Sequence, residues 1–388
     1  MSGARTGPRA QALPARPFFA GAPERTALAR ERFFADGQRP TGLVSEAVLQ
    51  SWQRCQQARR DPPERLGFDP VSASRQQRAL QRGRPLLQAA GPVLMRLEAA
   101  LAATGSRALL CDGEGMVVHR TPAASHPEPV LSLVARVGVD LSERAVGTTA
   151  PGIVLRTGQA VTVTRAEHYF DQCGTLSCAA APIHDRRGAL AGVLDLSVEG
   201  RPFGFDAAAL VGLYAGAIEN ALLEEPDGDG LVLRFQADPL LLGTPLQALA
   251  GVGGDGALRW INQVGRSLLG PAVVPGQAVE AVFGLGADTL LAATRSPAPQ
   301  PLRLANGLVV WLTVQLQLPA GAVPTPVLPA AAPEPPLPAA QAAPATLAEH
   351  DRQLVLDTLA RCGGNVSRAA RALGVSRGLL YRRLAALR

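Results

Sequence analysis

The chain has 388 residues, of which 47% are hydrophobic and 18% are charged, a composition typical of a folded protein of two to three domains and not of a disordered chain. All 38 basic residues are arginine. The lysine-dependent phosphate loop of a conventional ATPase and a lysine Schiff base are therefore both excluded. The net charge of +6 comes from basic ends around an acidic middle, which suggests a nucleic-acid-binding module joined to a domain with another task.

The N-terminal region precedes the first predicted domain. Residues 1–40 are rich in arginine and proline and are expected to form a disordered arm. The first residues lack the apolar core of a signal peptide, and no uninterrupted apolar run reaches the ~18 residues that span a bilayer. A cytoplasmic protein without a membrane partner is expected. Residues 41–85 are expected to be a helical pre-sensor segment, with one helix over 43–59.

Residues 86–226 are predicted to form an α+β domain of the sensor type. One helix is expected over 86–103 and a closing helix over 206–225, with Asp206 as its N-cap. Runs of strand-forming residues bounded by glycine turns predict five strands between the helices. These strands are expected at residues 108–112, 116–120, 160–164, 176–185 and 190–198.

A second, smaller α+β unit is predicted over residues 231–318. Within it, residues 251–270 read as a strand, a Gly-Asp-Gly turn, a second strand and a short helix, and residues 306–318 as a closing strand. The stretch that follows, residues 319–345, holds nine prolines and ten alanines. Because proline fixes φ and donates no backbone hydrogen bond, this stretch is expected to be an extended, semi-rigid linker.

Residues 346–388 are predicted to form a small all-α domain of three helices. A Gly-Gly pair ends the first helix, Asn365 caps the second and Ser376 caps the third. Short helices joined in this way are typical of the helix-turn-helix of DNA-binding proteins. Residues 361–388 hold seven arginines and no acidic residue, a charge pattern that a merely solvated helical hairpin does not explain.

The polar side of these helices carries the residues expected to touch DNA. The third-helix side chains expected at base edges are Arg377, Tyr381 and Arg382. The arginines expected near phosphates are Arg368, Arg371 and Arg383. The run GGNVSRAARALGVSRGLLYRRLAAL resembles the Fis-type DNA-binding domain of many bacterial activators. That resemblance implies a homodimer on two-fold symmetric double-stranded DNA. It also implies DNA contacts at Asn365, Ser367, Ser376, Arg377, Tyr381 and Arg382.

The N-terminal part resembles the same regulators. SWQRC (51–55) and GFDP (67–70) are similar to the segment before the sensor of acetoin-catabolism-regulator-like (AcoR-like) activators, and residues 138–197 resemble their GAF domain. Thr149 departs from the usual G-T-N-A run, which puts the local turn in doubt. Residues 251–270 resemble a PAS-like unit. These activators normally carry an AAA+ ATPase before the Fis-type domain, and here the linker takes that place, which implies a regulator that does not hydrolyse ATP.

Candidate ligand residues lie in the GAF-like region, at His168, Cys173 and Cys178. With Glu167 they offer a metal or redox site, since imidazole and thiolate suit several metals. Their spacing matches no standard zinc pattern, and a loop histidine beside two idle thiols is the other interpretation. The five cysteines are odd in number and lack CxxC pairs, so no disulfide framework is indicated. No metal or cofactor is predicted, only an unidentified small-molecule effector.

The sequence therefore predicts a sequence-specific DNA-binding transcriptional regulator that senses a small molecule and is not an enzyme. One alternative is an accessory DNA-binding partner that works with RNA polymerase or with an ATPase-bearing activator. A second alternative is a GAF-fold reductase that uses Cys173 and Cys178 to reduce a sulfoxide.

Overall fold

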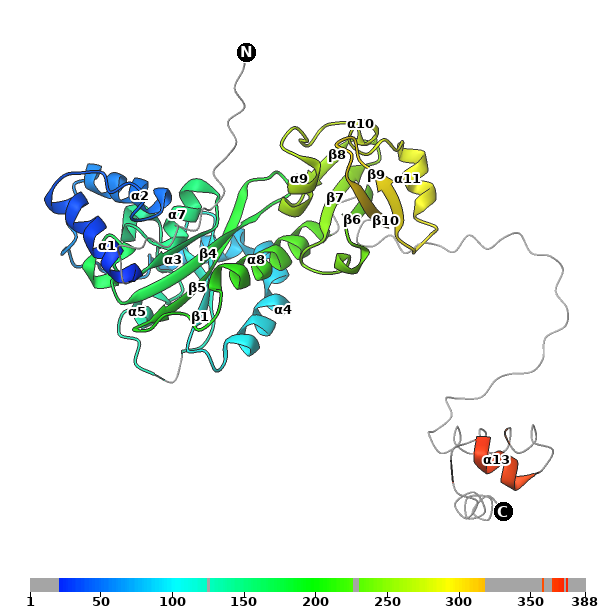
Figure 1. Cartoon of the computed structure of the whole chain (residues 1–388), viewed down its shortest axis with the longest axis horizontal. Helices are drawn as coiled ribbons and strands as arrows, with labels where there is room; N and C mark the ends of the chain where they lie inside the picture. The colour runs from blue at the N-terminus through cyan, green and yellow to red at the C-terminus, as the bar shows by residue number, and fades with distance from the viewer. Residues whose placement is uncertain are drawn as a thin grey trace. The chain divides into compact units, whose positions relative to one another are not determined.

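The computed structural model describes residues 21–123, 126–225 and 230–317 and, near the C-terminus, Thr358, residues 365–372 and Val375. The chain divides into two compact units, residues 1–322 and 323–388, and each is described by itself. The first unit is α+β and contains two five-stranded antiparallel sheets, one after the other along the chain (Figure 1).

The first sheet contains the five strands predicted from the sequence, each within one residue of its predicted ends. The strands are β1 (Arg107–Asp112), β2 (Val117–Arg120), β3 (Val161–Thr164), β4 (Leu176–His184) and β5 (Leu190–Glu199). They pair in the order β2-β1-β5-β4-β3. The long strands β4 and β5 are buried over most of their length, because helices cover both faces of the sheet.

Two long helices, α4 (Arg84–Leu101) and α8 (Ala207–Glu224), pack together on one face of this sheet (Figure 1). Asp206 caps α8 as predicted, since its carboxylate accepts a hydrogen bond from the N–H of Ala209. Within the described part of the chain, α8 alone is long and apolar enough to cross a membrane. Its buried side chains pack into the core under α4 and the sheet, which is the position of a core helix.

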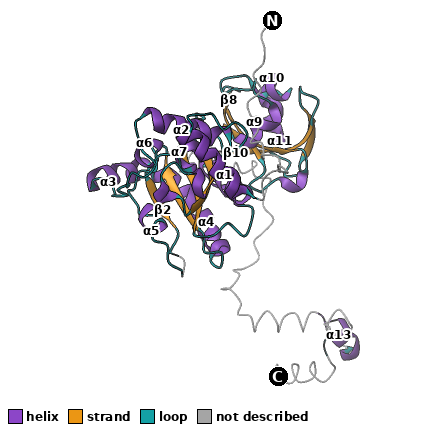
Figure 2. Ribbon diagram, turned by 60° about the vertical axis from the view of Figure 1, so that its left-hand side comes forward, coloured by secondary structure: helices purple, strands orange, loops and turns teal. Residues whose placement is uncertain are grey.

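Shorter helices cover the opposite face of the sheet. They are α1 (Ala22–Arg30), the π-helical turn η1 (Glu31–Ala35), α2 (Glu46–Gln57), α5 (Leu131–Val134), α6 (Glu143–Val146) and α7 (Ala150–Thr157). The domain also contains α3 (Ala73–Arg82) and the 3-10 turns η2 (Arg165–Glu167) and η3 (Asp171–Cys173). Their apolar side chains form a second core cluster that includes the fully buried Trp52. Figure 2 shows helices and strands of this domain in a second view.

The expectation of a disordered arm over residues 1–40 is wrong for residues 22–35, which form α1 and η1. The first 20 residues lie outside the described ranges. The ring of Phe34 packs on that of Trp52, with centroids 5.3 Å apart. The Arg30 guanidinium donates hydrogen bonds to three backbone carbonyl groups in the region just after β3. These partners lie far along the chain, so the local composition of the arm does not reveal them.

The second domain, residues 230–317, is built on the other sheet, with strand order β8-β7-β6-β10-β9. Its elements are β6 (Gly230–Gln236), the 3-10 turn η4 (Pro239–Leu241), β7 (Ala248–Gly253), β8 (Leu258–Ile261), α9 (Gln263–Leu269), α10 (Val279–Phe283), α11 (Ala287–Ala293), β9 (Gln300–Arg303) and β10 (Val309–Gln317). The strand, turn, strand and helix predicted over 251–270 correspond to β7, β8 and α9, and the predicted closing strand corresponds to β10.

The C-terminal part of α8 joins the two domains through buried polar contacts. Glu219 accepts hydrogen bonds from the backbone N–H of His184 in the first domain (2.9 Å) and from that of Gln263 at the start of α9 (2.8 Å). Its neighbour Asn220 accepts one from Nδ2 of Asn262 (2.8 Å). Because Glu219, Asn220 and Asn262 are all buried, these contacts form a polar seam between the two domains.

Asn262→Ala is expected to lower the free energy of unfolding by about 2–3 kcal/mol, because it leaves buried donors without an acceptor. The Asn262 side chain caps α9 by accepting from the N–H of Gly265 (2.8 Å), and it also accepts from the N–H of Leu249 (2.9 Å). Denaturant unfolding measures the loss. Asn306→Ala, which removes an exposed amide of the same domain, is the matched control and should cost under ~1 kcal/mol. Equal losses of unfolding free energy in both variants would contradict the buried hydrogen bonds of the polar seam.

Candidate functional site

A small cavity lies on the face of the first sheet that is opposite α4 and α8. Most of its wall is apolar and includes Leu109, Val134 and Leu176. Its polar lining residues are Thr149, Cys173, Cys178, Asp195 and Ser197. The cavity has a volume of about 10 Å³, close to the smallest that can hold one water molecule.

Strand alternation puts Asp195 and Ser197 into this cavity. Their side chains leave β5 on the cavity side, whereas the neighbouring Leu194 and Leu196 belong to the core under α4 and α8. Asp195 pairs in register with Leu109 on β1 and with Ala180 on β4. Its carboxyl group therefore lies over the central strand of the sheet, with 1% of the residue exposed.

Only one oxygen of the Asp195 carboxyl group has a hydrogen-bond partner among the described residues. Its Oδ2 accepts a hydrogen bond from the hydroxyl of Ser197 (2.6 Å), and its Oδ1 has no hydrogen-bond partner among the described residues. Burial raises the pKa of Asp195 to about 7, although the hydrogen bond from Ser197 opposes the shift. Near neutral pH this group therefore exists in both protonation states, and Oδ1 can donate or accept a hydrogen bond.

A chain of buried polar atoms leads away from Asp195. The hydroxyl of Ser197 lies 3.1 Å from Sγ of Cys178, which lies 3.6 Å from Nε2 of His168. Nδ1 of His168 lies 2.9 Å from the carbonyl oxygen of Arg165. Burial lowers the pKa of His168 to about 4, so its ring is neutral at pH 7. The structure thus brings two predicted ligand residues, His168 and Cys178, together.

Of the other two residues of the predicted ligand site, Cys173 lies at the cavity and Glu167 is bound to Thr164. Cys173 lines the cavity, whereas the carboxylate of Glu167 accepts hydrogen bonds from the N–H and hydroxyl of Thr164 (2.8 and 2.9 Å). Across the described ranges no cluster of His, Cys, Asp or Glu is suited to a metal ion. Burial raises the pKa of Cys173 to about 12 and that of Cys178 well above its usual value. Such protonated thiols are poor nucleophiles, which argues against a thiol-dependent reductase.

Thr149 retains the turn that its departure from the usual asparagine put in doubt. Its hydroxyl oxygen accepts a hydrogen bond from the N–H of Gly152 (3.1 Å) at the start of α7 and donates one to the carbonyl of Leu141 (3.3 Å). Threonine is a good N-cap, so the local helix start survives the change. The same residue forms part of the cavity wall.

Asp195 and Ser197 are not among the ligand residues predicted from the sequence. The signal was present, because LAGVLDLSV sets one acidic residue in the middle of an apolar strand. A carboxylate is rarely buried without a partner. Which partner it has depends on strand register and distant loops, which the strand itself does not specify.

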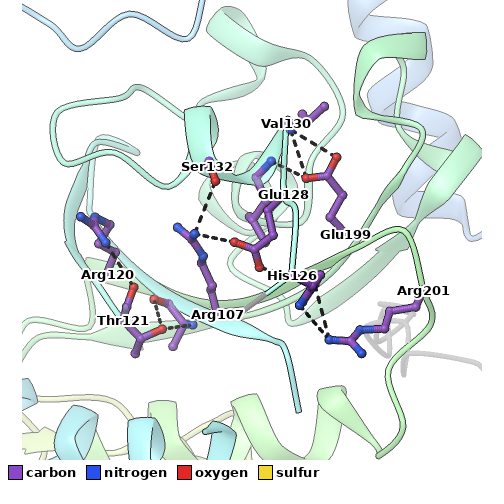
Figure 3. Close-up of polar contacts among 11 residues, drawn as sticks. Arg107, Arg120, Thr121, His126, Glu128, Val130, Ser132, Glu199 and Arg201 are labelled. Carbon is purple, nitrogen blue, oxygen red and sulfur yellow. Dashed lines mark hydrogen bonds and ion pairs between the residues drawn. The ribbon is translucent and has the colours of Figure 1, made fainter. Parts of the chain in front are cut away.

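A buried ion pair lies beside the cavity. The Arg107 guanidinium on β1 contacts the carboxylate of Glu128, and their side chains are 4% and 1% exposed (Figure 3). Nearby, Glu199 accepts a hydrogen bond from the N–H of Leu131 (2.8 Å), at the start of α5. Since α5 also supplies Val134 to the cavity, these charged groups hold one part of the cavity wall in place.

The predicted DNA-contacting residues are only partly within the described part of the chain. Asn365 caps α13 (Val366–Ala372), because its side chain accepts a hydrogen bond from the N–H of Arg368 (3.2 Å). Arg368 and Arg371 are exposed, while the alanines between them are buried. The helix therefore has one apolar and one basic face. Ser376, Arg377, Tyr381, Arg382, Arg383 and the side chain of Ser367 lie outside the described residues.

Two family models match the chain. The one described as "MimR, N-terminal domain" matches residues 22–215, half of the 388 residues. The one described as "Bacterial regulatory protein, Fis family" matches residues 346–387. The second match covers the segment in which the sequence predicts a Fis-type domain.

Curated relatives are similar to a part of the chain. The propane 2-monooxygenase operon transcriptional activator MimR of Mycolicibacterium smegmatis is 33% identical over 177 residues, 45% of this chain and 29% of the relative. The acetoin dehydrogenase operon transcriptional activator AcoR of Bacillus subtilis is 31% identical over 169 residues, 43% of this chain and 28% of the relative. The chain thus spans under a third of the length of these relatives. Among solved structures, the E. coli DhaR(N)–DhaL complex matches with a TM-score of 0.42 and 16% identity, over 71% of this chain and 100% of that chain.

The interval between the second sheet and the Fis-family match is short. β10 ends at Gln317 and the match begins at residue 346, so the residues between them are too few for an ATPase domain. The second domain itself lacks the lysine that a phosphate loop requires. The chain therefore belongs to the MimR/AcoR family of bacterial transcriptional regulators, with that family's N-terminal domain, a Fis-family segment and no ATPase between them.

Proposed function

We propose that the protein is a sequence-specific regulator that binds double-stranded DNA, senses a small molecule in a GAF-type first domain and has no ATPase activity of its own. The observation that carries this proposal is the Fis-family segment, in which residues 361–388 hold seven arginines and no acidic residue. Such a charge density attracts DNA phosphates. The capped helix α13, with Arg368 and Arg371 on its exposed face, supports the same role.

The cavity supports the sensing part of the proposal. A buried carboxyl with an unoccupied oxygen is unfavourable unless another group compensates it, and a bound molecule does so. The cavity lies in the domain that matches the family's N-terminal domain. The polar seam gives a physical route from this domain to the second one, from which the chain leads on to the DNA-binding segment.

The proposal includes a cytoplasmic homodimer, because a two-fold symmetric reader matches two half-sites on DNA. The second candidate is an accessory role beside an ATPase-bearing activator. It is favoured because the relatives are named as activators, whereas this chain has no lysine and so no phosphate loop. Transcription in vitro separates the two. A regulator that acts alone changes transcript levels with RNA polymerase only, whereas an accessory protein acts only when the second activator is added.

Arg382→Ala is expected to weaken binding to the specific duplex by ~1–3 kcal/mol and to leave random DNA nearly unaffected, as expected for a base contact. Arg383→Ala is expected to weaken binding to both duplexes alike and to reduce the salt slope by about one unit, as expected for a phosphate contact. Fluorescence anisotropy across a salt series, with a duplex selected from a random pool and a scrambled duplex, measures both effects.

The matched control for these variants is Arg295→Ala, which removes an exposed arginine of the second domain and should leave binding unchanged. If Arg382→Ala and Arg383→Ala lose equal affinity on both duplexes, the assigned base contact and phosphate contact are wrong. If neither variant loses affinity, the C-terminal segment does not read DNA.

A further inference from the structure

We infer that Arg30 is a positioning residue for the wall of the first-domain cavity, and that release of its side chain from residues 165–173 opens the cavity. These residues, the wall loop, follow β3 and end at Cys173, which lines the cavity. The inference rests on the sensing role proposed above. It adds the route of entry into the cavity, which does not follow from the family match.

Entry requires that part of the wall moves, because the cavity of about 10 Å³ holds roughly one water molecule. The wall at Cys173 and Phe68 comes from the turn η3 and an irregular segment, whereas most of the other lining residues belong to strands or helices. These two parts are tied together, since the N–H of Leu66 donates a hydrogen bond to Oε1 of Gln172 (2.9 Å). Segments without strand ladders or long helices open at the lowest cost in free energy, so the wall should open here.

Two side chains from distant parts of the sequence, Arg30 and Trp52, hold four successive backbone carbonyl groups of the wall loop. Nη1 of Arg30 lies 2.9, 3.2 and 3.3 Å from three of the carbonyl oxygens, and Nε1 of Trp52 lies 2.7 Å from the fourth. The four carbonyl groups belong to Ala166, Glu167, His168 and Tyr169. Because the wall loop forms only the short turns η2 and η3, these groups depend on side-chain donors for their hydrogen bonds.

The guanidinium group of Arg30 is oriented by further contacts. Its Nη2 donates a hydrogen bond to the carboxylate of Asp171 (2.6 Å), also in the wall loop, and its Cζ lies 4.8 Å from the centroid of the Phe34 ring. The Phe34 ring in turn packs on that of Tyr169, with centroids 5.3 Å apart. This arrangement uses the planar fork of arginine, whose N–H groups point in fixed directions. A lysine would keep the charge and lose those directions.

The wall next to α5 is held more firmly than the wall loop. The side chains of the Arg107–Glu128 pair beside it are 4% and 1% exposed, and breaking a buried ion pair leaves charges without compensation. The ion pair of Arg30 with Asp171 differs, because the Asp171 side chain is 61% exposed and its carboxylate is hydrated when the contact breaks. Release of the wall loop is therefore the easier opening.

Three buried cysteines report which part of the first domain opens. Cys173 lies in the wall loop, and Sγ of Cys178 on β4 lies 3.6 Å from Nε2 of His168, also in the wall loop. Movement of the wall loop therefore uncovers Cys173 and Cys178 together. Cys111 on β1 is fully buried and is not among the residues that line the cavity, so it should stay protected until the domain unfolds.

The test uses the full chain and methyl methanethiosulfonate, a small neutral reagent that modifies cysteine thiols, at urea concentrations below the unfolding transition. Mass spectrometry measures the labelling rate of each cysteine, which reports how often the structure around that thiol opens. The variants are Arg30→Ala, Arg30→Lys and Arg107→Ala. The matched control is Arg32→Ala, which removes a neighbouring exposed arginine.

In the unsubstituted chain, Cys173 and Cys178 should be labelled faster than Cys111 and with little dependence on urea, because local opening exposes little surface. Labelling of Cys111 should depend steeply on urea, since it requires global unfolding.

The variants should separate the two kinds of opening. Arg30→Ala should speed the labelling of Cys173 and Cys178 about tenfold or more, because charged hydrogen bonds of the closed state are lost. Arg30→Lys should give a smaller increase, and Arg32→Ala should stay within about twofold of the unsubstituted chain. Arg107→Ala removes a contact that release of the wall loop leaves intact, so it should speed the labelling of Cys111 only.

Two results overturn the inference. One is labelling of Cys173 and Cys178 with the rate and urea dependence of Cys111; the other is labelling of these two thiols that responds to Arg107→Ala and not to Arg30→Ala. The urea series on the unsubstituted chain decides the question even if a variant fails to fold. DNA retardation on the same preparation separates this inference from the proposed function. DNA binding with either of these results refutes only the role of Arg30, whereas the expected labelling without DNA binding refutes the regulatory role.

Discussion

Replacement of Arg107 by alanine is expected to lower the free energy of unfolding by about 3–5 kcal/mol, the usual cost of leaving a buried charge without its partner. The Glu128 side chain is 1% exposed, and neither of its carboxylate oxygens has a well-aligned hydrogen bond from a described residue. The ion pair with Arg107 is therefore its main compensation, and among the described residues a more distant contact with His126 (3.8 Å) adds to it. Denaturant unfolding followed by circular dichroism measures the loss.

The double variant Arg107→Met with Glu128→Leu is the control for that experiment. It removes both charges and keeps apolar volume, so its stability should return to near that of the unsubstituted protein or exceed it. A loss under ~1 kcal/mol for Arg107→Ala alone would show that water reaches Glu128, contrary to the buried pair in the structure.

The second large effect is a pH dependence of the free energy of unfolding, to which Asp195 and His168 make opposing contributions. The pKa of Asp195 is raised to about 7, so its contribution to stability is full below its unfolded pKa near 4 and is lost as the pH rises to 7. The pKa of His168 is lowered to about 4, so its contribution is present above its unfolded pKa of 6.5 and is lost as the pH falls to 4. Between pH 4 and 6.5 the two slopes oppose each other and nearly cancel.

Single substitutions should expose each slope. Relative to the unsubstituted chain, His168→Gln should lose stability and Asp195→Asn should gain stability, each on the order of 3 kcal/mol as the pH rises from 4 to 6.5. Unfolding titrations over this range compare the three proteins. Identical pH profiles for all three would mean that neither side chain is desolvated as the structure has it.

Local patterns account for what the sequence analysis predicted correctly. The strands of the first sheet alternate or are uniformly apolar between glycine turns, and the caps at Asp206 and Asn365 act on residues three positions away, so short-range rules suffice. β9 (QPLR) has no such pattern. It contains a proline, is largely exposed and pairs only with β10 at the sheet edge, and so it depends on its neighbour.

The missed features depend on contacts between distant residues. α1 and η1 are ordered against Trp52 and the region after β3, although their own composition is that of a charged arm. The role of Asp195 follows from its register with Leu109 and Ala180 and from its contact with Ser197. His168 and Cys178, by contrast, lie near each other in the sequence, and their proximity in the structure was within reach of prediction.

Selection of DNA by the full chain from a random duplex pool tests the central claim most directly. The account predicts that rounds of binding and recovery enrich one recurrent sequence with two similar half-sites. It also predicts that a chain with Arg377, Arg382 and Arg383 replaced by alanine enriches none. Recovery of a pool without a shared sequence, or of the same sequence by the substituted chain, would contradict DNA recognition through the Fis-family segment.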